Sequence, residues 1–162
     1  YPGEKYFISK FQGLPGQIAW VIGASMIIRR AAYDAIAGFD EAYFLYGEET
    51  DLCLRLRQQG WAIEYIPDVS VQHIGGASEK TSSAEQVWTR KQHGLHLFYR
   101  KHYTPTEILF LLKKDIRSAR KRLFILRLKQ YFTRQNQKEQ FKYERYLTIK
   151  NLSQQFLMSL RK

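Results

Sequence analysis

The sequence predicts an α/β fold class for the first half of the chain and an α-helical extension for the second. Three observations support this prediction: an apolar run typical of a buried strand at residues 17–29, two alternating apolar segments within residues 61–74, and amphipathic helix starts after residue 80. Short helices are predicted between the strand-like segments. We therefore divide the chain into residues 1–80 and residues 81–162.

Composition is typical of a folded protein, because 44% of the 162 residues are hydrophobic and 15% are aromatic. The single cysteine, Cys53, excludes an internal disulfide framework and suits a reducing compartment. We find no signal-peptide pattern at Tyr1 and no apolar run of about 18 residues, which is the length needed to span a bilayer. The chain begins without an initiator methionine, so we expect it to be a segment of a longer protein.

Charge is divided unevenly between the two halves. Residues 1–80 carry seven Lys/Arg and ten Asp/Glu, a net charge of −3. Residues 81–162 carry nineteen Lys/Arg and five Asp/Glu, a net charge of +14. The basic half is expected to attract phosphate groups, whether of nucleic acids, nucleotides or anionic lipid headgroups.

The first elements of the chain are a loop and a strand. Residues 1–16 are rich in turn residues and are expected to form the loop, with at most one short strand. The run QIAWVIGASMIIR at 17–29 is expected to form a buried strand, interrupted by Gly23 and Ala24. Small residues at these positions indicate a bulge, tight packing under a helix, or a ligand that passes close to the backbone.

Two short helices follow, each ended by a glycine. The first is expected at residues 30–37 with Gly38 as its stop, and the second at residues 48–59 with Gly60 as its stop. The loop at 39–47 between them is rich in aromatic side chains, which either enter the core or wall a site.

The next segments, WAIEYIP at 61–67 and VSVQHI at 69–74, are expected to form strands that turn at Pro67-Asp68. Strand, helix and strand pair in this order are typical of half of a larger α/β sheet.

The second half is expected to be helical, at about residues 83–102, 105–134 and 138–160. Two capping-box sequences indicate the first two starts: Ser82-Ser83-Ala84-Glu85, with Ser82 as N-cap, and Thr104-Pro105-Thr106-Glu107.

The second of these helices continues as the basic amphipathic stretch KKDIRSARKRLFILRLKQYF. Its cations either solvate a protein surface or, interleaved as they are with Leu, Phe and Ile, lie on a membrane surface, which we favour. No nucleic-acid-reading motif accompanies the charge, so we do not predict nucleic acid as a partner.

Three carboxylates open the helix at 48–59: Glu48, Glu49 and Asp51. Because successive helical side chains are about 100° apart, Glu48 and Asp51 share one face and Glu49 points elsewhere. The three acids either complement the helix dipole or stand at the rim of a pocket, where a partly buried Glu49 can act as a general base.

His73 lies near the end of the last predicted strand, before a glycine pair. Its imidazole is either structural or a ligand for a metal or a phosphate. No second histidine lies within metal-ligand spacing, so a metal here would need partners outside this segment.

Taken together, residues 20–78 carry an ordered set of motifs: G-A-S-M, G-F-D-E, Y-G-E-E-x-D-L-C-L-R and P-D-x-x-V-x-H. This set resembles the C-terminal half of the catalytic domain in family 2 glycosyltransferases, most closely their rhamnosyltransferase-like branch. The resemblance implies a GT-A fold, which is a Rossmann-like nucleotide-diphospho-sugar transferase domain. Residues 1–80 would be its C-terminal, acceptor-side half.

The resemblance also assigns roles to the acids. The acidic pair of the family corresponds to Glu48-Glu49, and Glu49 would be the base that deprotonates the acceptor hydroxyl. The family often has Asp at this position, and Glu extends the carboxylate by one methylene. Asp51, Asp40 and Arg55, which all lie in the shared motifs, would support the site.

Other positions would bind substrate or metal. Trp20, Gly23 and Ala24 would line the sugar or acceptor side of the cleft. His73 falls where some relatives place a histidine that helps to hold the metal–diphosphate. No Asp-x-Asp metal motif occurs in this chain. The main ligands of the implied divalent metal, Mg or Mn, are therefore expected in a missing N-terminal half, and we expect this segment to be inactive alone.

The implied activity is inverting transfer of a sugar from a nucleotide-diphosphate donor to a hydroxyl of a saccharide or lipid-linked acceptor in cell-surface polysaccharide synthesis. We expect a cytoplasmic location, peripheral to the inner face of the cell membrane. An uncovered sheet edge would favour a homo-oligomer. The alternative is a non-catalytic binding or assembly module whose helical tail recruits a membrane or a partner.

Overall fold

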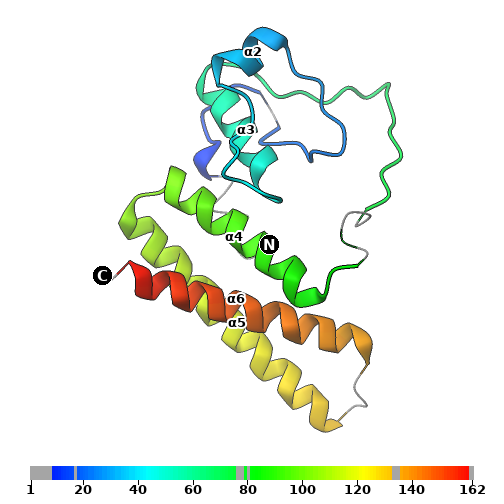
Figure 1. Ribbon diagram of the computed structural model, residues 1–162, viewed down its shortest axis with the longest axis vertical. Coiled ribbons are helices and arrows are strands. Elements are labelled where there is room, and N and C mark those ends of the chain that lie inside the picture. Colours follow the sequence, from blue (N-terminus) through cyan, green and yellow to red (C-terminus); the bar gives the residue numbers. More distant parts are fainter. Residues whose placement is uncertain (1–8, 17, 76–78, 80, 133–135, 161–162) are drawn as a thin grey trace. The chain divides into compact units, whose positions relative to one another are not determined.

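The computed structural model describes residues 9–16, 18–75, 79, 81–132 and 136–160, with the backbone alone for residues 131 and 132. These residues contain the helices α2 to α6, two further helical residues at Ser9 and Lys10 within the predicted loop, and no strand (Figure 1). The chain divides into two compact units, one that ends at Ser78 and one that begins at Glu79.

The predicted α/β class is therefore wrong, and with it the GT-A half-domain and its open sheet edge. In the described residues, the segments expected as strands at 17–29, 61–67 and 69–74 are non-helical and unpaired, and residue 17 lies outside the description. Apolar side chains expected in a core are exposed, such as Ile22 at 70% and Ile27 at 91%. A strand needs a neighbouring strand for its backbone hydrogen bonds, and the described residues place none beside these segments.

The first unit contains the two short helices α2 (Arg30–Ala35) and α3 (Glu48–Gln58). Its core consists of Ala32 from α2 with Leu52 and Leu56 from α3. Partly buried apolar side chains pack around these three residues: Met26, Ile28, Tyr33, Ile36, Trp61 and Ile63. Apolar burial therefore holds α2 and α3 together and fixes the start of α3.

Both glycine stops are confirmed. Gly38 has a φ of 70° and Gly60 a φ of 88°, in the left-handed region that glycine tolerates. After α3, the Trp61 N–H donates to the Leu56 carbonyl oxygen at 3.1 Å, which satisfies a carbonyl of the last turn.

The second unit is a helical bundle of α4 (Ala84–His102), α5 (Pro105–Phe132) and α6 (Gln137–Ser159). In Figure 1, α5 and α6 run along each other, and α4 packs against α6. The bundle core is formed by large apolar side chains of all three helices, including Phe98, Tyr99, Leu111, Leu112, Ile149 and Phe156. The three predicted helices are confirmed, although the predicted end at residue 134 lies outside the described residues.

The start of α4 differs from its prediction by one residue. Ser83, and not Ser82, is the N-cap: its Oγ accepts from the Gln86 N–H at 3.2 Å, and the Gln86 Oε1 accepts from the Ser83 N–H at 2.9 Å. The sequence SSAEQ offers the capping spacing twice, and Ser82 instead accepts a hydrogen bond from Arg90.

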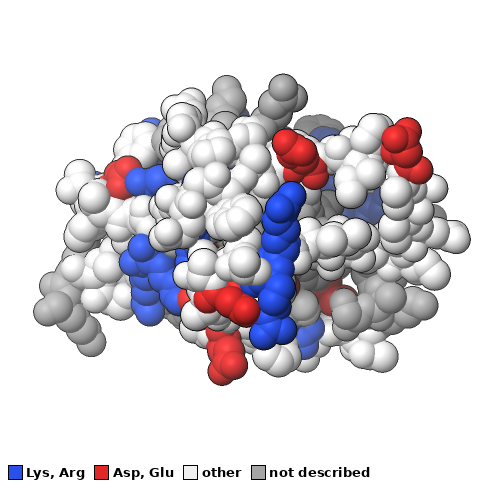
Figure 2. Space-filling view, turned by 90° about the horizontal axis from the view of Figure 1, so that it is seen from above, with Lys and Arg blue, Asp and Glu red and all other residues white. Residues whose placement is uncertain are grey.

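The start of α5 is confirmed. The Thr104 N–H donates to the Glu107 Oε2 at 2.8 Å, and the Glu107 N–H donates to the Thr104 Oγ1 at 3.3 Å. No helix within the described residues is long and apolar enough to cross a membrane. On the face shown in Figure 2, basic and acidic side chains are interspersed among uncharged ones, so no patch of a single sign dominates this view.

Candidate active site

The chain enters α3 through two left-handed residues, Tyr46 with a φ of 72° and Gly47 with a φ of 96°. Gly47 is the N-cap and has no side chain to accept the N–H groups of the first turn. Glu48, Glu49 and Asp51 lie in that turn, where a carboxylate is stabilised by the positive end of the helix dipole. The three acids nevertheless lie in different environments.

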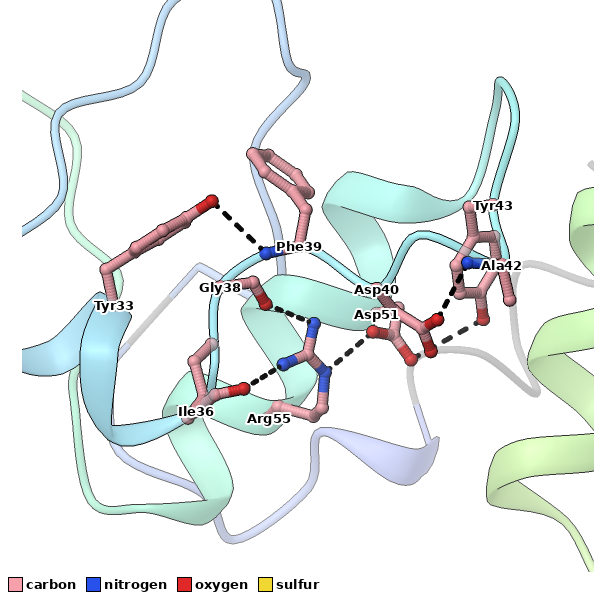
Figure 3. Close-up of polar contacts among 9 residues, drawn as sticks. All are labelled: Tyr33, Ile36, Gly38, Phe39, Asp40, Ala42, Tyr43, Asp51 and Arg55. Carbon is pink, nitrogen blue, oxygen red and sulfur yellow. Dashed lines mark hydrogen bonds and ion pairs between the residues drawn. The ribbon is translucent and has the colours of Figure 1, made fainter.

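Asp51 belongs to a buried polar network (Figure 3). Its side chain is 1% exposed, its Oδ2 lies 2.7 Å from the Arg55 Nε, and its Oδ1 lies 3.5 Å from the Tyr43 hydroxyl. Arg55 also donates to the carbonyl oxygens of Ile36 and Gly38, both at 2.8 Å. The network therefore ties α3 to the segment that follows α2, and Asp51 and Arg55 position the start of α3.

The loop before α3 is closed by a smaller set of contacts. The Asp40 Oδ1 accepts from the Ala42 N–H at 3.0 Å, which makes a turn closed by the aspartate side chain. Asp40 therefore shapes the loop that leads to the acids. In the same loop, burial and then the nearby Asp51 charge raise the pKa of the Tyr43 phenol.

Glu49 is different, because its carboxylate is half-buried and has a free oxygen. Among the described residues, the Glu49 Oε2 is buried without a hydrogen-bond partner. Burial raises the pKa of Glu49, its backbone N–H lowers it, and the Glu48 charge raises it. The Glu48 Oε2 is also buried without a partner in the described part of the chain. Two adjacent carboxylates with unused acceptor oxygens can receive protons from a ligand.

Gly23 lies beside Glu49. A Cβ added to Gly23 would meet the Glu49 Cβ at 3.9 Å, an ordinary van der Waals contact. Cys53, one turn along α3, has its pKa raised by burial, lowered by the Val21 N–H, and raised by the Glu49 charge. The face of α3 that carries Glu49 and Cys53 therefore borders the segment around Gly23.

The other predicted ligand-lining residues near Gly23 occupy less enclosed positions. Ala24 is exposed, as is Gly23 itself. Trp20 is half-buried and its ring packs against that of Phe11, with 5.5 Å between centroids. The segment can border a ligand that reaches Glu49, although the described residues do not enclose it.

His73 is exposed in a non-helical segment. No group of three or more His, Cys, Asp or Glu side chains in the described residues could hold a metal ion. The structure does not bring His73 and the acids of α3 together as a ligand set.

Arg57 is a structural residue that the sequence did not predict. It is 4% exposed and donates to the carbonyl oxygens of Pro15 at 2.6 Å, Leu14 at 2.7 Å and Gly16 at 2.9 Å, with Ala19 at 3.4 Å. Backbone acceptors leave no signature in the sequence, so no pattern could have identified this role.

A groove of about 370 Å³ lies elsewhere, between α4 and α6 of the second unit. It is lined by His93, His96, Leu97, Arg100, Leu152, Gln155, Phe156 and Ser159. None of the residues predicted to act in sugar transfer lines this groove.

Comparisons with known proteins place the acidic residues of α3 within a family match. The family described as Glycosyltransferase like family 2 matches residues 4–94, more than half of the 162 residues. The chain is 41% identical over 56 residues to N-acetylglucosaminyl-diphospho-decaprenol L-rhamnosyltransferase of Mycobacterium tuberculosis. It is 38% identical over 56 residues to Rhamnosyltransferase WbbL of Escherichia coli K12.

These matches are partial in both directions. Each aligned segment covers 35% of this chain, and it spans 18% of the Mycobacterium tuberculosis protein and 21% of the Escherichia coli protein. No solved structure matches the chain.

Proposed function

The chain belongs to the glycosyltransferase-like family 2, and from that membership we propose that it supplies the acceptor side of an inverting glycosyltransferase. The reaction transfers a sugar from a nucleotide-diphosphate donor to a hydroxyl of a saccharide or lipid-linked acceptor, in the synthesis of a cell-surface polysaccharide. Two similar proteins are named as rhamnosyltransferases, so a rhamnose donor is the first to test.

The observation that carries this proposal is the state of Glu49. Its carboxylate is half-buried, keeps an oxygen without a partner among the described residues, and has a raised pKa. Backbone N–H groups of Gly47 and Glu49 stabilise this carboxylate, as expected at a helix start, but they leave its Oε2 available to a ligand. A raised pKa makes the ionised form a stronger proton acceptor.

In the proposed step, the Glu49 carboxylate takes the proton of the acceptor hydroxyl while the hydroxyl oxygen attacks the anomeric carbon of the donor. The bond from that oxygen to C1 forms as the bond from C1 to the diphosphate oxygen breaks, and its electron pair leaves with the nucleotide diphosphate. Attack on the side opposite the leaving group inverts the anomeric carbon. Glu48 supports the base because its charge contributes to the raised pKa of Glu49.

Neighbouring residues position this carboxylate. Asp51 and Arg55 fix the start of α3 through the network that includes Tyr43. Gly23 presents no side chain toward Glu49. With Ala24 and Trp20 it borders the route by which an acceptor approaches the base.

The resemblance also implies a divalent metal, but the described residues do not fit one. They contain no group of three metal-ligating side chains, and His73 supplies a single imidazole. We therefore assign no step to a metal. Ligands for one would have to come from outside the described residues.

The test is Glu49→Gln in the complete protein, with transfer from a nucleotide-diphospho-rhamnose donor as the assay. Because the amide cannot accept the proton, kcat is expected to fall by about 10²-fold or more while donor binding is retained. Glu64→Gln is the matched control, since Glu64 is an exposed acid of the first unit that lies outside the shared motifs. Near-normal turnover of Glu49→Gln, or an equal loss in Glu64→Gln, would contradict the assignment.

A further inference from the structure

The long helix α5 has one buried side and one exposed side. Its buried apolar residues are Ile108, Leu111, Leu112, Ile116, Ala119, Leu123 and Leu126. Six of its exposed residues share one side of the helix, and we name this set the α5 basic face: Lys113, Arg117, Arg120, Lys121, Phe124 and Leu128. At 3.6 residues per turn these six lie within an arc of about 100°, opposite the buried side.

The charge of the α5 basic face has a single sign. Helix α5 contains two acidic residues, and neither lies on this face, because Glu107 caps the first turn and Asp115 is buried. Lys113, Arg117 and Lys121 are spaced four residues apart, so like charges are neighbours along the helix. Such pairs destabilise a helix unless a counter-charge is nearby.

No acidic side chain forms an ion pair with these cations, Lys113, Arg117, Arg120 and Lys121, in the described part of the chain. A solvated helix surface is commonly laced with opposite charges at this spacing. The α5 basic face is therefore complementary to an extended negative surface outside the bundle.

The α5 basic face also contains exposed apolar side chains. Phe124 is 62% exposed and Leu128 is 44% exposed, and they are four residues apart just beyond the cations. A nucleic acid backbone would use the cations but would leave a phenylalanine and a leucine in water. A bilayer interface accepts both, because apolar side chains enter the acyl boundary while cations remain among the headgroups.

We propose that the α5 basic face binds the surface of a membrane that carries anionic lipid headgroups, with α5 lying along that surface. The inference concerns the second unit alone and does not depend on the proposed sugar transfer. The partner is a bilayer surface and not a soluble polyanion, because the surface combines cations with exposed apolar side chains.

The first measurement is binding of the full 162-residue chain to vesicles. Vesicles of phosphatidylcholine with about one-third phosphatidylglycerol supply the anionic surface, and phosphatidylcholine alone is the comparison. We expect binding to the anionic vesicles at low salt, a steep fall as salt rises, and little binding to phosphatidylcholine. Absence of binding to anionic vesicles at low salt would overturn the inference.

Matched charge variants locate the surface. The double variant Arg117→Gln, Lys121→Gln is expected to weaken binding about tenfold or more. The control Arg29→Gln, Arg30→Gln removes the same charge from exposed positions in the first unit and is expected to leave binding within about twofold. An equal loss in the two pairs would show dependence on net charge alone and would overturn the assignment to α5.

An apolar variant separates a membrane from other polyanions. Phe124→Ser, Leu128→Ser keeps every cation and is expected to weaken vesicle binding while binding to a soluble polyanion such as heparin is unchanged. Unaltered vesicle binding in this variant would show recognition of charge alone and would overturn the membrane inference. Circular dichroism of each variant checks that the helices are retained.

Discussion

Glu49 and Asp51 lie two positions apart on α3, and the structure gives them different chemistry. The two oxygens of Asp51 meet Arg55 and Tyr43 inside the first unit, so this carboxylate has an internal counter-ion. Glu49 has a raised pKa and an oxygen without a partner among the described residues. An acid with a fixed counter-ion serves the fold, whereas Glu49 retains the capacity to accept a proton.

The influence of Glu48 on Glu49 gives a prediction on the pH dependence of transfer. Because the Glu48 charge helps to raise the pKa of Glu49, Glu48→Gln should lower that pKa. The acid limb of kcat/KM, which reflects protonation of the base in the free enzyme, should then shift to lower pH. The measurement is a pH–rate profile of parent and variant in the complete protein.

The matched control for this profile is again Glu64→Gln, which should leave the acid limb in place. An acid limb that moves to higher pH in Glu48→Gln, or that does not move, would show that another group governs it. A loss of kcat that is uniform across the pH range would assign Glu48 to positioning and not to the pKa of the base.

At the scale of the single element, α5 begins with a closed cap. The Thr104 Oγ1 accepts from the Glu107 N–H, and the Glu107 carboxylate accepts from both the N–H and the hydroxyl of Thr104. We expect Thr104→Ala to reduce the free energy of unfolding of the bundle by about 1 kcal/mol, because it removes the acceptor of the N-cap.

Urea unfolding followed by circular dichroism measures this change. Thr106→Ala is the control, since Thr106 is exposed in the same turn and makes no side-chain hydrogen bond within the described residues. It should change stability by less than about 0.5 kcal/mol. Comparable losses in the two variants would contradict the cap as the cause, because replacement of Thr by Ala by itself raises helix propensity.

The helices could be predicted closely because their signals are local. Capping boxes, the glycines after α2 and α3 and the apolar spacing of α4 to α6 all act within a few residues. The ambiguity at Ser82-Ser83 shifted one start by a single position. The segments at 17–29 and 61–74 could not be predicted in this way, because a strand depends on a partner that its own residues do not reveal.

In the candidate site, too, local features could be predicted from the sequence and tertiary contacts could not. From the sequence we could predict that Glu48, Glu49 and Asp51 lie at the start of one helix. We could also predict that Glu49 lies on a different face from the other two. The different roles of the acids depend on burial and on distant partners. Asp51 contacts Tyr43 and Arg55, and Arg55 donates to the carbonyl oxygen of Ile36, fifteen residues before Asp51. Contacts of this kind depend on tertiary packing, which spacing along one helix cannot express.

At the scale of the whole molecule, the second unit contains two buried titratable groups with opposite shifts. Burial raises the pKa of Asp115 from 3.8 to about 7, and the Lys114 charge and Tyr99 hydroxyl oppose this shift. Burial lowers the pKa of His96 from 6.5 to about 3, and the charges of His93 and Arg100 lower it further. The fold therefore favours both groups in their neutral forms.

The signs of the two contributions follow from proton linkage. Between pH 3.8 and about 7 the folded chain keeps the Asp115 proton that the unfolded chain has lost, so this group reduces stability as pH rises. Between pH 6.5 and about 3 the unfolded chain binds a proton at His96 that the folded chain does not, so this group reduces stability as pH falls. The two slopes oppose each other where the windows overlap.

We therefore expect Asp115→Asn to be more stable than the parent at pH 8, by up to about 4 kcal/mol, because the shift spans about three pKa units and one unit corresponds to about 1.4 kcal/mol. At pH 4 the two should differ by much less, since Asp115 is already protonated in the folded parent. Urea unfolding of both proteins at the two pH values is the measurement. A difference that is the same at pH 4 and pH 8 would show that ionisation of Asp115 is not its cause.

The attachment of Arg57 to the start of the first unit restricts substitutions at some positions of the sequence and tolerates them at others. All four acceptors of Arg57 are main-chain oxygens, at Leu14, Pro15, Gly16 and Ala19. Side chains in this loop can therefore diverge among descendants of the protein without loss of the anchor. Gly16 is the exception, because its φ of 86° and the Ile63 nitrogen, 2.8 Å from where a Cβ would stand, exclude a side chain. Selection on this attachment should fall on position 57 and on that glycine.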